Sequence, residues 1–494
     1  MGNQPQPPSP GGAPDAWSRF VSPLAGRYSS DAMQALWSPR QRFESWRRLW
    51  VALAQAQHEL GLNVSREQVE ALRGAVAMTD DDFRRAEEHE ARLRHDVMAH
   101  VHAFGDRVPA ARGVIHLGMT SQDINCNAET PIIGAALDLV AAKLARVIAD
   151  LGRFAGRFAD LPTLGFTHYQ PAQPTTVGKR AAMWGHDLAL CLERVEFTRA
   201  SLRLRGLKGA TGTQASFLAL FNGDESKVDE LERRFVAALG WPEGRVHAFT
   251  GQTYPRVTDA HVLSELASVA AAVHKVCNDL RLLCSRREVD EPFETHQIGS
   301  SAMPYKRNPM RCERTTGLCR VVMSLAASGT DTAATQWLER TLDDSSARRV
   351  ALPEAFLALD GALDTLHNVC AGLVVHEASV KRNLAEELPF MATEVILMEA
   401  ARLGRDRQDA HEAIRRHAQE AGLHVKQQGG SNDLIERLRA EPMLKGVDLD
   451  AALDPARHIG RAPSQARAFA EVAAGIASRY REKIAGLGEV SLKV

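Results

Sequence analysis

Three long stripes of apolar residues constrain the fold of this chain more than any other feature of its sequence. In the first, apolar side chains recur every three or four positions from residue 133 to residue 158. Two similar stripes cover residues 262–283 and 352–373. This spacing predicts helices well above the usual length of about 11–12 residues. We therefore expect a nearly all-α protein built on a long helical bundle, with Pro131 in the first turn of the first long helix.

The rest of the chain divides around these stripes. Punctuation by glycine and proline predicts a disordered tail at 1–20, an N-terminal helical domain at 21–118, the central bundle at 119–373 and a C-terminal helical domain at 374–494. Within the N-terminal domain, helical spacing predicts that four apolar residues belong to the core: Trp46, Leu49, Trp50 and Leu53.

Composition and charge exclude several classes of protein. Of the 494 residues, 45% are apolar and 24% are charged, which is typical of a soluble globular chain. The net charge of −1 argues against a general affinity for nucleic acid or anionic membranes. No run approaches the ~20 apolar residues of a membrane span. Seven cysteines without a CxxC pair predict reduced thiols in the cytoplasm and no zinc site.

The segment Gly299–Pro309, which reads GSSAMPYKRNP, carries the strongest chemical signal. Small residues allow its backbone to bend, and Ser300 and Ser301 place two hydroxyls side by side. Four cations follow within a short distance: Lys306, Arg307, Arg311 and Arg314. A hydroxyl-bearing loop that leads into a cationic segment is suited to holding a polyanion and moving a proton.

His168 is a candidate acid or base. Pro171 disfavours helix at Gln170, so we expect His168 at the irregular start of a helix, among hydrogen-bonding neighbours that suit proton transfer near neutral pH. Taken alone, one of 18 histidines is more often structural, but together with the serine loop the catalytic interpretation is favoured.

Four further segments suit anion binding. The run Arg94-His95-Asp96 fits phosphate or carboxylate, whereas the spacing of its histidines and the absence of HExxH argue against a metal. For Thr120 and Ser121, an anion site at a helix start and a plain helix cap both stay open. A phosphate clamp is predicted from Arg340, Ser345 and Arg349. The adjacent acidic pair, Asp343 and Asp344, either orients these arginines or solvates a loop, and Gln252 lies in TGQTY, a weak signal by itself.

These motifs follow one another in the order typical of the animal-type adenylosuccinate lyase family of the fumarase/aspartase superfamily. The resemblance runs from about residue 22 to about residue 470 and rests on SPLAGRY, RLRHDVMAHVH, HLGMTS, THYQPAQPTTVGKR, TGQTY, GSSAMPYKRNP and QWLERTLDDSS. One departure lies at Gln122–Asn127, which is nearer the common superfamily form.

The resemblance implies a three-domain helical fold and a homotetramer in which each active site draws residues from three subunits. It implies a carbon–nitrogen lyase of purine nucleotide biosynthesis that eliminates fumarate from succinylated purine nucleotides, with no metal or organic cofactor. Two alternatives stay open: a sister lyase acting on argininosuccinate, and a catalytically silent helical scaffold.

The resemblance also assigns roles to residues. It implies Ser300 as general base, His168 as general acid, Glu313 as the carboxylate that orients His168, and Lys306 as a cation for the developing charge. The implied substrate-binding residues are Arg27, Tyr28, Arg94, His95, Asp96, Thr120, Ser121, Gln252, Asn308, Arg314, Arg340, Ser345 and Arg349.

Overall fold

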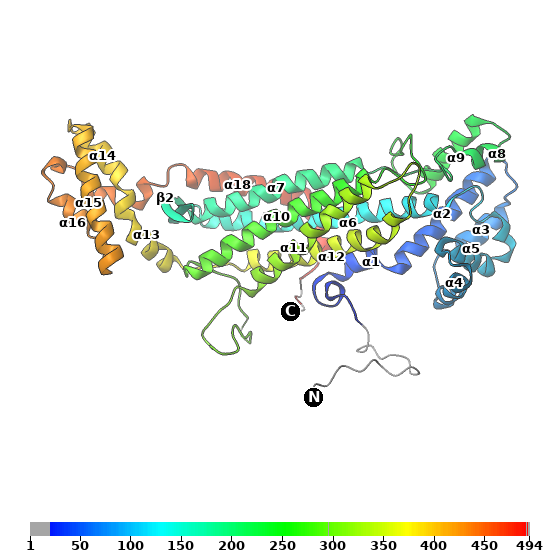
Figure 1. Ribbon diagram of the computed structural model, residues 1–494, viewed down its shortest axis with the longest axis horizontal. Helices are drawn as coiled ribbons and strands as arrows, with labels where there is room; N and C mark the ends of the chain where they lie inside the picture. The colour runs from blue at the N-terminus through cyan, green and yellow to red at the C-terminus, as the bar shows by residue number, and fades with distance from the viewer. Residues whose placement is uncertain (1–19, 295, 491, 493–494) are drawn as a thin grey trace.

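The computed structural model describes residues 20–294, 296–490 and 492, and helices make up most of them. An elongated bundle forms the middle of the molecule (Figure 1). Its helices are α6 (Ser121–Arg157), α7 (Val177–Ser201), α10 (Val257–Ser285), α11 (Met310–Ala334), α12 (Asp343–Ala371) and α18 (Ala462–Arg479). The three predicted stripes lie on α6, α10 and α12, where their apolar residues are buried in one core. The nearly all-α prediction is confirmed.

The prediction that Pro131 opens the first long helix is wrong. Helix α6 begins ten residues earlier, at Ser121, with Thr120 as its N-cap, and continues through Pro131. Proline removes one backbone N–H from a helix interior, but burial along most of α6 outweighs this loss. Thr120 and Ser121 stand at a helix start, as both alternatives expected, and Thr120 forms the capping box of α6 with Asp123.

One end of the bundle carries a second core. It is built from α2 (Pro39–Glu59), α3 (Arg66–Gly74), α5 (Asp96–Arg107), η2 (Pro109–Val114), α8 (Ala215–Leu220) and α9 (Glu225–Ala238). Helix α4 (Asp80–Leu93) packs on α5. The elements η1 (Leu24–Tyr28) and α1 (Asp31–Leu36) pack on the bundle instead, where Leu24 and Met33 belong to its core. The predicted core face of α2 is buried, with Trp46, Trp50 and Leu53 each at most 1% exposed. Helices α8 and α9 come from the middle of the sequence yet pack into this core (Figure 1).

The opposite end holds a third core, formed by residues between 392 and 452. The elements at this end are α13 (Glu377–Met391), α14 (Thr393–Arg402), α15 (Arg407–Gln428), α16 (Leu434–Arg439), η3 (Pro442–Leu444), α17 (Leu449–Ala452) and η4 (Pro455–Arg457). After them α18 returns along α6 and α7, and α19 (Arg481–Gly486) follows it. The domain boundaries proposed above stay a prediction, and the predicted tail lies outside the described residues apart from Phe20.

Four short strands interrupt the helices. Strands β1 (Pro162–Thr167) and β2 (Gln170–Thr176) form an antiparallel hairpin in which Thr167 pairs with Gln170. Strands β3 (Val289–Asp290) and β4 (Val374–Val375) also pair antiparallel. In the described part of the chain no helix is long and apolar enough to span a bilayer, and all seven cysteines are free thiols.

Candidate active site

Most of the predicted anion-binding residues line one cavity of about 700 Å³, which we call the α12 cavity. It lies where the start of α5, the start of α6 and the start of α12 meet. The predicted residues that line it are Arg94, His95, Asp96, Ser121, Gln252, Arg340, Ser345 and Arg349. Segments more than 200 residues apart in sequence therefore contribute to one binding surface.

Asp96 holds one arginine at the rim of the α12 cavity. Arg349 Nη2 donates a hydrogen bond of 2.6 Å to Asp96 Oδ2. Burial opposes ionisation of Asp96, but the hydrogen bond and charge of Arg349 outweigh it and hold the pKa of Asp96 below its ordinary value. The ionised carboxylate of Asp96 thus holds the half-exposed guanidinium of Arg349 in place. The remaining N–H groups of this guanidinium are available to a ligand.

His95 joins two of the helices that form this cavity. Its Nδ1 accepts a 3.3 Å hydrogen bond from the Met98 N–H, so His95 caps the start of α5. This bond assigns the proton of a neutral ring to Nε2, which lies 3.3 Å from Ser121 Oγ at the start of α6. Arg94, beside it, is exposed and has no side-chain hydrogen bond or ion pair within the described ranges, so its guanidinium is free for an anion.

The two adjacent aspartates, Asp343 and Asp344, have different contacts. Asp344 is buried and accepts from Arg340 Nη1 at 3.3 Å and from Arg256 Nε at 2.8 Å. It therefore orients Arg340, which was one of the two open alternatives. Asp343 is exposed, and its Oδ1 accepts the Asp344 N–H at 3.0 Å, so it belongs to the first turn of α12 instead.

A buried ionic network beneath the cavity was missed in the sequence. Arg348 bridges Glu129 on α6 at 2.8 Å and Asp259 on α10 at 2.6 Å, and it also donates to the Tyr254 hydroxyl. Glu129 and Asp259 are acidic residues on long helices with apolar stripes. A buried charge requires a partner. These two carboxylates, on helices with buried faces, were therefore the sequence signal that could have predicted the network.

Asp123 was also missed. It is buried, and its carboxylate accepts hydrogen bonds from the Arg205 guanidinium and from the backbone N–H groups of Thr120 at 2.8 Å, Lys208 at 2.9 Å and Gly209 at 3.2 Å. It thereby fixes the loop at 205–209 against the start of α6. The signal was present, since Thr-x-x-Asp at 120–123 has the spacing of a capping box.

His168 lies elsewhere, at the tip of the β1–β2 hairpin. The prediction of a helix start is wrong: His168 and Tyr169 form the two-residue turn, with φ of 52° and 55°. Two positive φ values match the twist of the flanking strands. The His168 ring is exposed and has no hydrogen-bond partner among the described residues.

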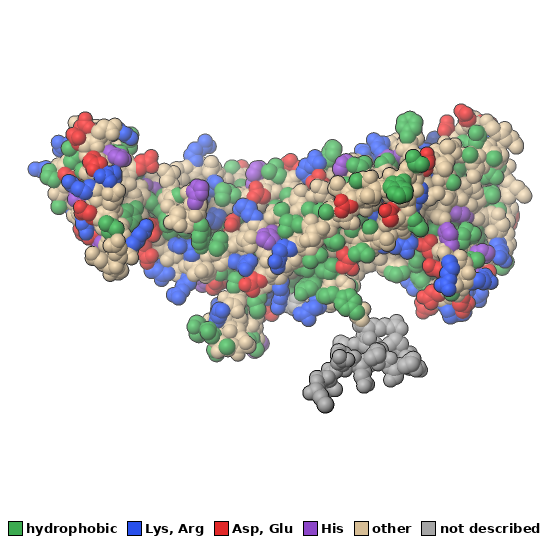
Figure 2. Space-filling model, in the orientation of Figure 1, with side chains coloured by type: hydrophobic (Ala, Val, Ile, Leu, Met, Phe, Trp, Pro, Cys, Tyr) green, Lys and Arg blue, Asp and Glu red, His purple; other side chains and the backbone are tan. Residues whose placement is uncertain are grey.

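Ser300 lies in the loop between α10 and α11, which stands off the bundle (Figures 1 and 2). Ser300 Oγ accepts from the backbone N–H groups of Met303 at 3.1 Å and Ala302 at 3.4 Å. Asn308 Nδ2 donates to Gly299 O at 2.9 Å and closes the loop tip. Two N–H dipoles directed at one hydroxyl oxygen stabilise negative charge on it. Lys306 is exposed on the same tip, with no side-chain bond in the described structure.

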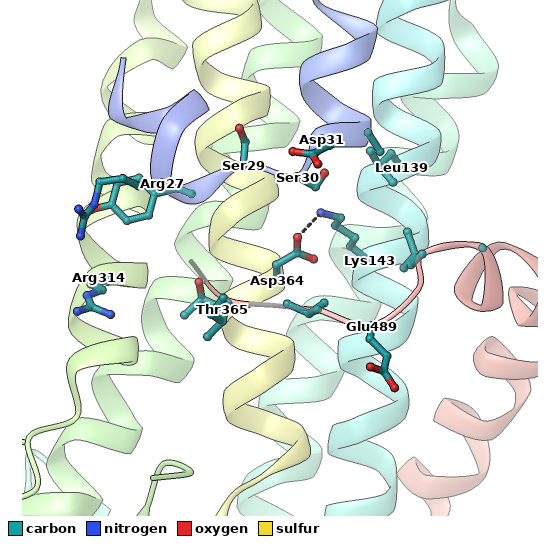
Figure 3. A pocket seen from close by; sticks show the side chains of 16 residues that line it. Arg27, Ser29, Ser30, Asp31, Leu139, Lys143, Arg314, Asp364, Thr365 and Glu489 are labelled. Carbon is teal, nitrogen blue, oxygen red and sulfur yellow. Dashed lines mark hydrogen bonds and ion pairs between the residues drawn. The ribbon is translucent and has the colours of Figure 1, made fainter. Parts of the chain in front are cut away.

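Glu313, Arg314, Arg27 and Tyr28 lie around a third place on the bundle. Arg27, Tyr28 and Arg314 line a cavity of about 420 Å³, drawn in Figure 3, beside the buried Lys143–Asp364 pair. Neither guanidinium has an ion pair among the described residues. Glu313 is half exposed, and its carboxylate lies 3.9 Å from the Arg281 guanidinium; within the described residues it has no contact with His168.

One chain does not bring these groups together. Ser345 lines the α12 cavity, whereas Thr365, on the same helix, lines the Arg27 cavity. Twenty residues of α-helix separate them by about 30 Å. The hairpin packs on α13, near the other end of the bundle (Figure 1). Within the described residues there is no group of three or more His, Cys, Asp or Glu side chains placed to hold a metal ion.

Comparison with known proteins identifies the family. Residues 26–324 match a lyase family model and residues 389–469 match the adenylosuccinate lyase C-terminus model. The adenylosuccinate lyase of Saccharomyces cerevisiae is 49% identical over 92% of this chain and 95% of its own length. The adenylosuccinate lyase of Schizosaccharomyces pombe is 47% identical over 92% of this chain and 94% of its own.

Solved structures share the fold. The 3-carboxy-cis,cis-muconate lactonizing enzyme of Pseudomonas putida aligns with a TM-score of 0.78 and 28% identity, covering 93% of this chain and 99% of that one. A fumarate lyase from Mesorhizobium sp. BNC1 aligns with a TM-score of 0.77 at 24% identity, covering 90% of this chain and 98% of that one. Fold, motif order and full-length identity agree: the chain belongs to the adenylosuccinate lyase family of the fumarase/aspartase superfamily.

Proposed function

We propose that this chain is a carbon–nitrogen lyase that eliminates fumarate from adenylosuccinate to give AMP. The same reaction on the succinylaminoimidazole carboxamide ribotide gives AICAR, so the enzyme serves purine nucleotide biosynthesis. The observation that carries the mechanism is the Ser300 hydroxyl, which is held at an exposed loop tip by two backbone N–H groups. Seven free thiols fit a reducing compartment, and the proposal places the enzyme in the cytoplasm.

Ser300 acts as the general base in this proposal. A serine is a weak acid, so its alkoxide forms only where fixed dipoles or cations stabilise it. The N–H groups of Ala302 and Met303 supply the dipoles, and Lys306 on the same tip supplies a charge. The alkoxide removes a proton from the carbon beside a succinyl carboxylate, and the negative charge that develops on this carboxylate is met by Lys306 and Asn308.

His168 acts as the general acid. Its ring is exposed on a short turn and has no partner among the residues that the structure describes, so it is accessible to a substrate nitrogen. Protonation of this nitrogen lets the carbon–nitrogen bond break and fumarate leave. Glu313 orients the imidazole from a neighbouring subunit, since the two side chains share no bond within the described parts of one chain.

The α12 cavity and the Arg27 cavity bind the anionic parts of the substrate. Arg340 and Arg349 present forked donors, which match phosphate and carboxylate groups. Arg27 and Arg314 add two more guanidinium groups, neither of which has an ion pair in the described part of the chain. Because a single substrate cannot reach both cavities of one chain across about 30 Å of α12, we propose that each active site combines them from different subunits of a homotetramer.

An exposed face of α7 supports this assembly. Met183, Leu190 and Phe197 are 43%, 48% and 61% exposed and recur every seven residues, so they form one apolar line along the helix. Such a line favours packing against another copy of the bundle. The second subunit would cover this line and supply the site residues that one chain holds apart.

The test is an ultraviolet assay of purified protein with adenylosuccinate. Ser300→Ala is expected to lower kcat by about 100- to 10,000-fold, the usual contribution of a general base, while binding persists. Ser301→Ala is the matched control, because its exposed hydroxyl has no hydrogen bond in the described structure. Equal rates for the two variants would refute the base assignment, and turnover of argininosuccinate alone by the wild type would refute the substrate.

Subunit mixing tests the shared site. Ser300→Ala and His168→Ala homotetramers are each expected to be nearly inactive. After subunit exchange, some sites combine an intact loop with an intact hairpin, so activity returns. A mixture that exchanges subunits, as shown by tagged chains, but stays inactive would contradict a site built from several subunits.

A further inference from the structure

The loop that carries Ser300 has two parts that behave differently in the structure. Its tip, residues 299–308, is bonded almost entirely to itself through Ser300, Asn308 and the Lys306 N–H. The tip is also compact, because a Cβ on Gly299 would lie 2.2 Å from Lys306 O. Its apolar side chains project away from the bundle (Figure 2), with Met303 and Tyr305 49% and 84% exposed, and Ile298, just before the tip, is 76% exposed. The tip is thus a preformed unit whose position must be set elsewhere.

The neck of the loop is buried and is held by two charged side chains. Glu291, at the start of the loop, is 6% exposed and accepts from the backbone N–H of Arg311 at 2.9 Å with Oε1 and from that of Cys312 at 3.1 Å with Oε2. These are free donors in the first turn of α11. One carboxylate therefore ties the residue that enters the loop to the helix that leaves it.

Arg311 closes the neck from the other side. Its side chain is 7% exposed. Nη1 donates to Pro292 O at 2.9 Å and to Asn368 Oδ1 on α12 at 2.8 Å. Nη2 donates to Glu294 Oε1 at 2.6 Å, with a longer contact of 3.4 Å to Gln297 Oε1. One guanidinium thus connects Pro292, Glu294 and Gln297, near the start of the loop, to two bundle helices.

These bonds account for the attachment of the loop. Apart from the backbone bonds that begin α11, every hydrogen bond that joins described residues of 291–309 to the helices starts or ends on Glu291 or Arg311. Pro292 adds a close packing contact, since a Cβ on Gly372 would lie 2.7 Å from Pro292 Cβ. Small changes at such a neck produce larger displacements at the tip, because the tip has no second anchor in these parts of the chain.

We propose that Glu291 and Arg311 form a clasp that positions the Ser300 tip, and that they act on the reaction through the tip without touching the substrate. The proposal rests on the proposed function of Ser300. A displacement of about 1 Å at a reacting group costs about 100-fold in rate. Because the arginines of the α12 cavity belong to other elements, the clasp affects kcat far more than KM.

Glu291→Gln and Arg311→Lys test the clasp. Glutamine cannot accept both N–H bonds without placing its own NH2 group against a donor, and lysine keeps the charge but cannot reach four acceptors from a planar fork. Both variants are expected to lower kcat by about 10- to 100-fold, with KM within threefold of wild type. Arg311→Lys is expected to retain more activity than Arg311→Met, which has neither charge nor donors.

Glu288→Gln is the matched control. Glu288 lies three residues earlier and is equally buried, but it bonds Asn383 on α13 and Arg286 instead of the loop. It is expected to lower stability by a similar amount and to leave kcat within twofold. A kcat for Glu291→Gln equal to that of Glu288→Gln would overturn the clasp.

Hydrogen exchange separates failure of this proposal from failure of the proposed function. In Glu291→Gln and Arg311→Lys the amides of residues 296–309 are expected to exchange faster than in wild type, whereas in Glu288→Gln they keep wild-type rates. This readout needs no turnover, so it stands even if adenylosuccinate proves not to be the substrate. Unchanged exchange of the loop in both clasp variants would overturn the proposal.

Discussion

Replacing Lys143 tests whether the buried charges beside the Arg27 cavity are coupled as the structure shows. Lys143 is 3% exposed, and its Nζ lies 2.5 Å from Asp360 and 2.6 Å from Asp364 (Figure 3 draws the second contact). Lys143→Met keeps much of the side-chain volume but leaves two buried carboxylates without their shared cation. Removing one partner of a buried pair typically costs 3–5 kcal/mol.

The remaining contacts place the cost at the lower end of this range. Asp364 still pairs with Arg146 at 2.8 Å, and Asp360 still accepts the Ser30 N–H at 2.6 Å. We therefore expect Lys143→Met to lower the free energy of unfolding by about 3 kcal/mol. Urea unfolding followed by circular dichroism measures it, at one fixed protein concentration because the midpoint of the proposed homotetramer would depend on concentration.

Lys381→Met is the control for this substitution. Lys381 and Glu377 form an exposed pair of 3.4 Å on one helix, with side chains 66% and 55% exposed. Such surface pairs contribute about 0–1 kcal/mol. The double variant Lys143→Met/Asp360→Asn is expected to recover part of the lost stability, because it removes one of the two stranded charges.

The effect also depends on pH, with a definite sign. Burial raises the pKa of Asp360 in the folded protein, and Lys143 opposes this shift. Without Lys143 the pKa rises further, so the folded state binds more protons than the unfolded state above the ordinary aspartate pKa of about 3.9. Stability then falls as pH rises through this window. The deficit of Lys143→Met is expected to be smaller at pH 5 than at pH 8. A deficit below about 1 kcal/mol, or one independent of pH, would refute this reasoning.

Two further substitutions probe the anion site and the histidine run. Arg340→Lys loses the fork that Asp344 orients, so steady-state kinetics should show KM raised about 10- to 100-fold at nearly constant kcat; a selective loss of kcat would contradict a binding role. Burial lowers the pKa of His100 to about 4, so urea midpoints of the wild type should fall from pH 7 to pH 5, because the unfolded state takes up the proton first. His100→Phe keeps the stacking on Phe43 and should reduce this fall. An unchanged fall would contradict the assignment of the pH effect to His100. A loss of activity that zinc restores would contradict a structural role for this histidine.

The sequence predicted the core better than it predicted the ends of the helices. Apolar periodicity identified the buried faces of α6, α10 and α12 because burial, not local propensity, decides those residues. The same reasoning misplaced the start of α6 at Pro131, since a proline reduces local stability without ending a helix that is packed along most of its length. The capping box at Thr120 and Asp123 was the better indicator of this helix start.

The prediction of a helix start at His168 was wrong for a different reason. Two-residue hairpin turns usually carry asparagine, aspartate or glycine, which tolerate positive φ. His168 and Tyr169 adopt φ of 52° and 55° without any of these residues, so no local pattern marked the hairpin. Non-glycine residues held in this region are concentrated at functional sites, and this agrees with the proposed role of His168 as the acid.

The arrangement of the site could not follow from motif order, because motif order does not record which subunit supplies each residue. Long straight helices keep Ser345 and the Arg27 cavity about 30 Å apart in one chain, and no loop closure of a rigid bundle removes that distance. Under the proposed assembly, one chain gives its loop to one site and its α12 arginines to another. A substitution in one cluster of one chain therefore disables only the site to which that chain contributes the cluster. This division is the reason that two inactive variants are expected to restore activity when mixed, and it links the proposed chemistry of Ser300 and His168 to the exposed apolar line on α7, which we propose as a subunit contact.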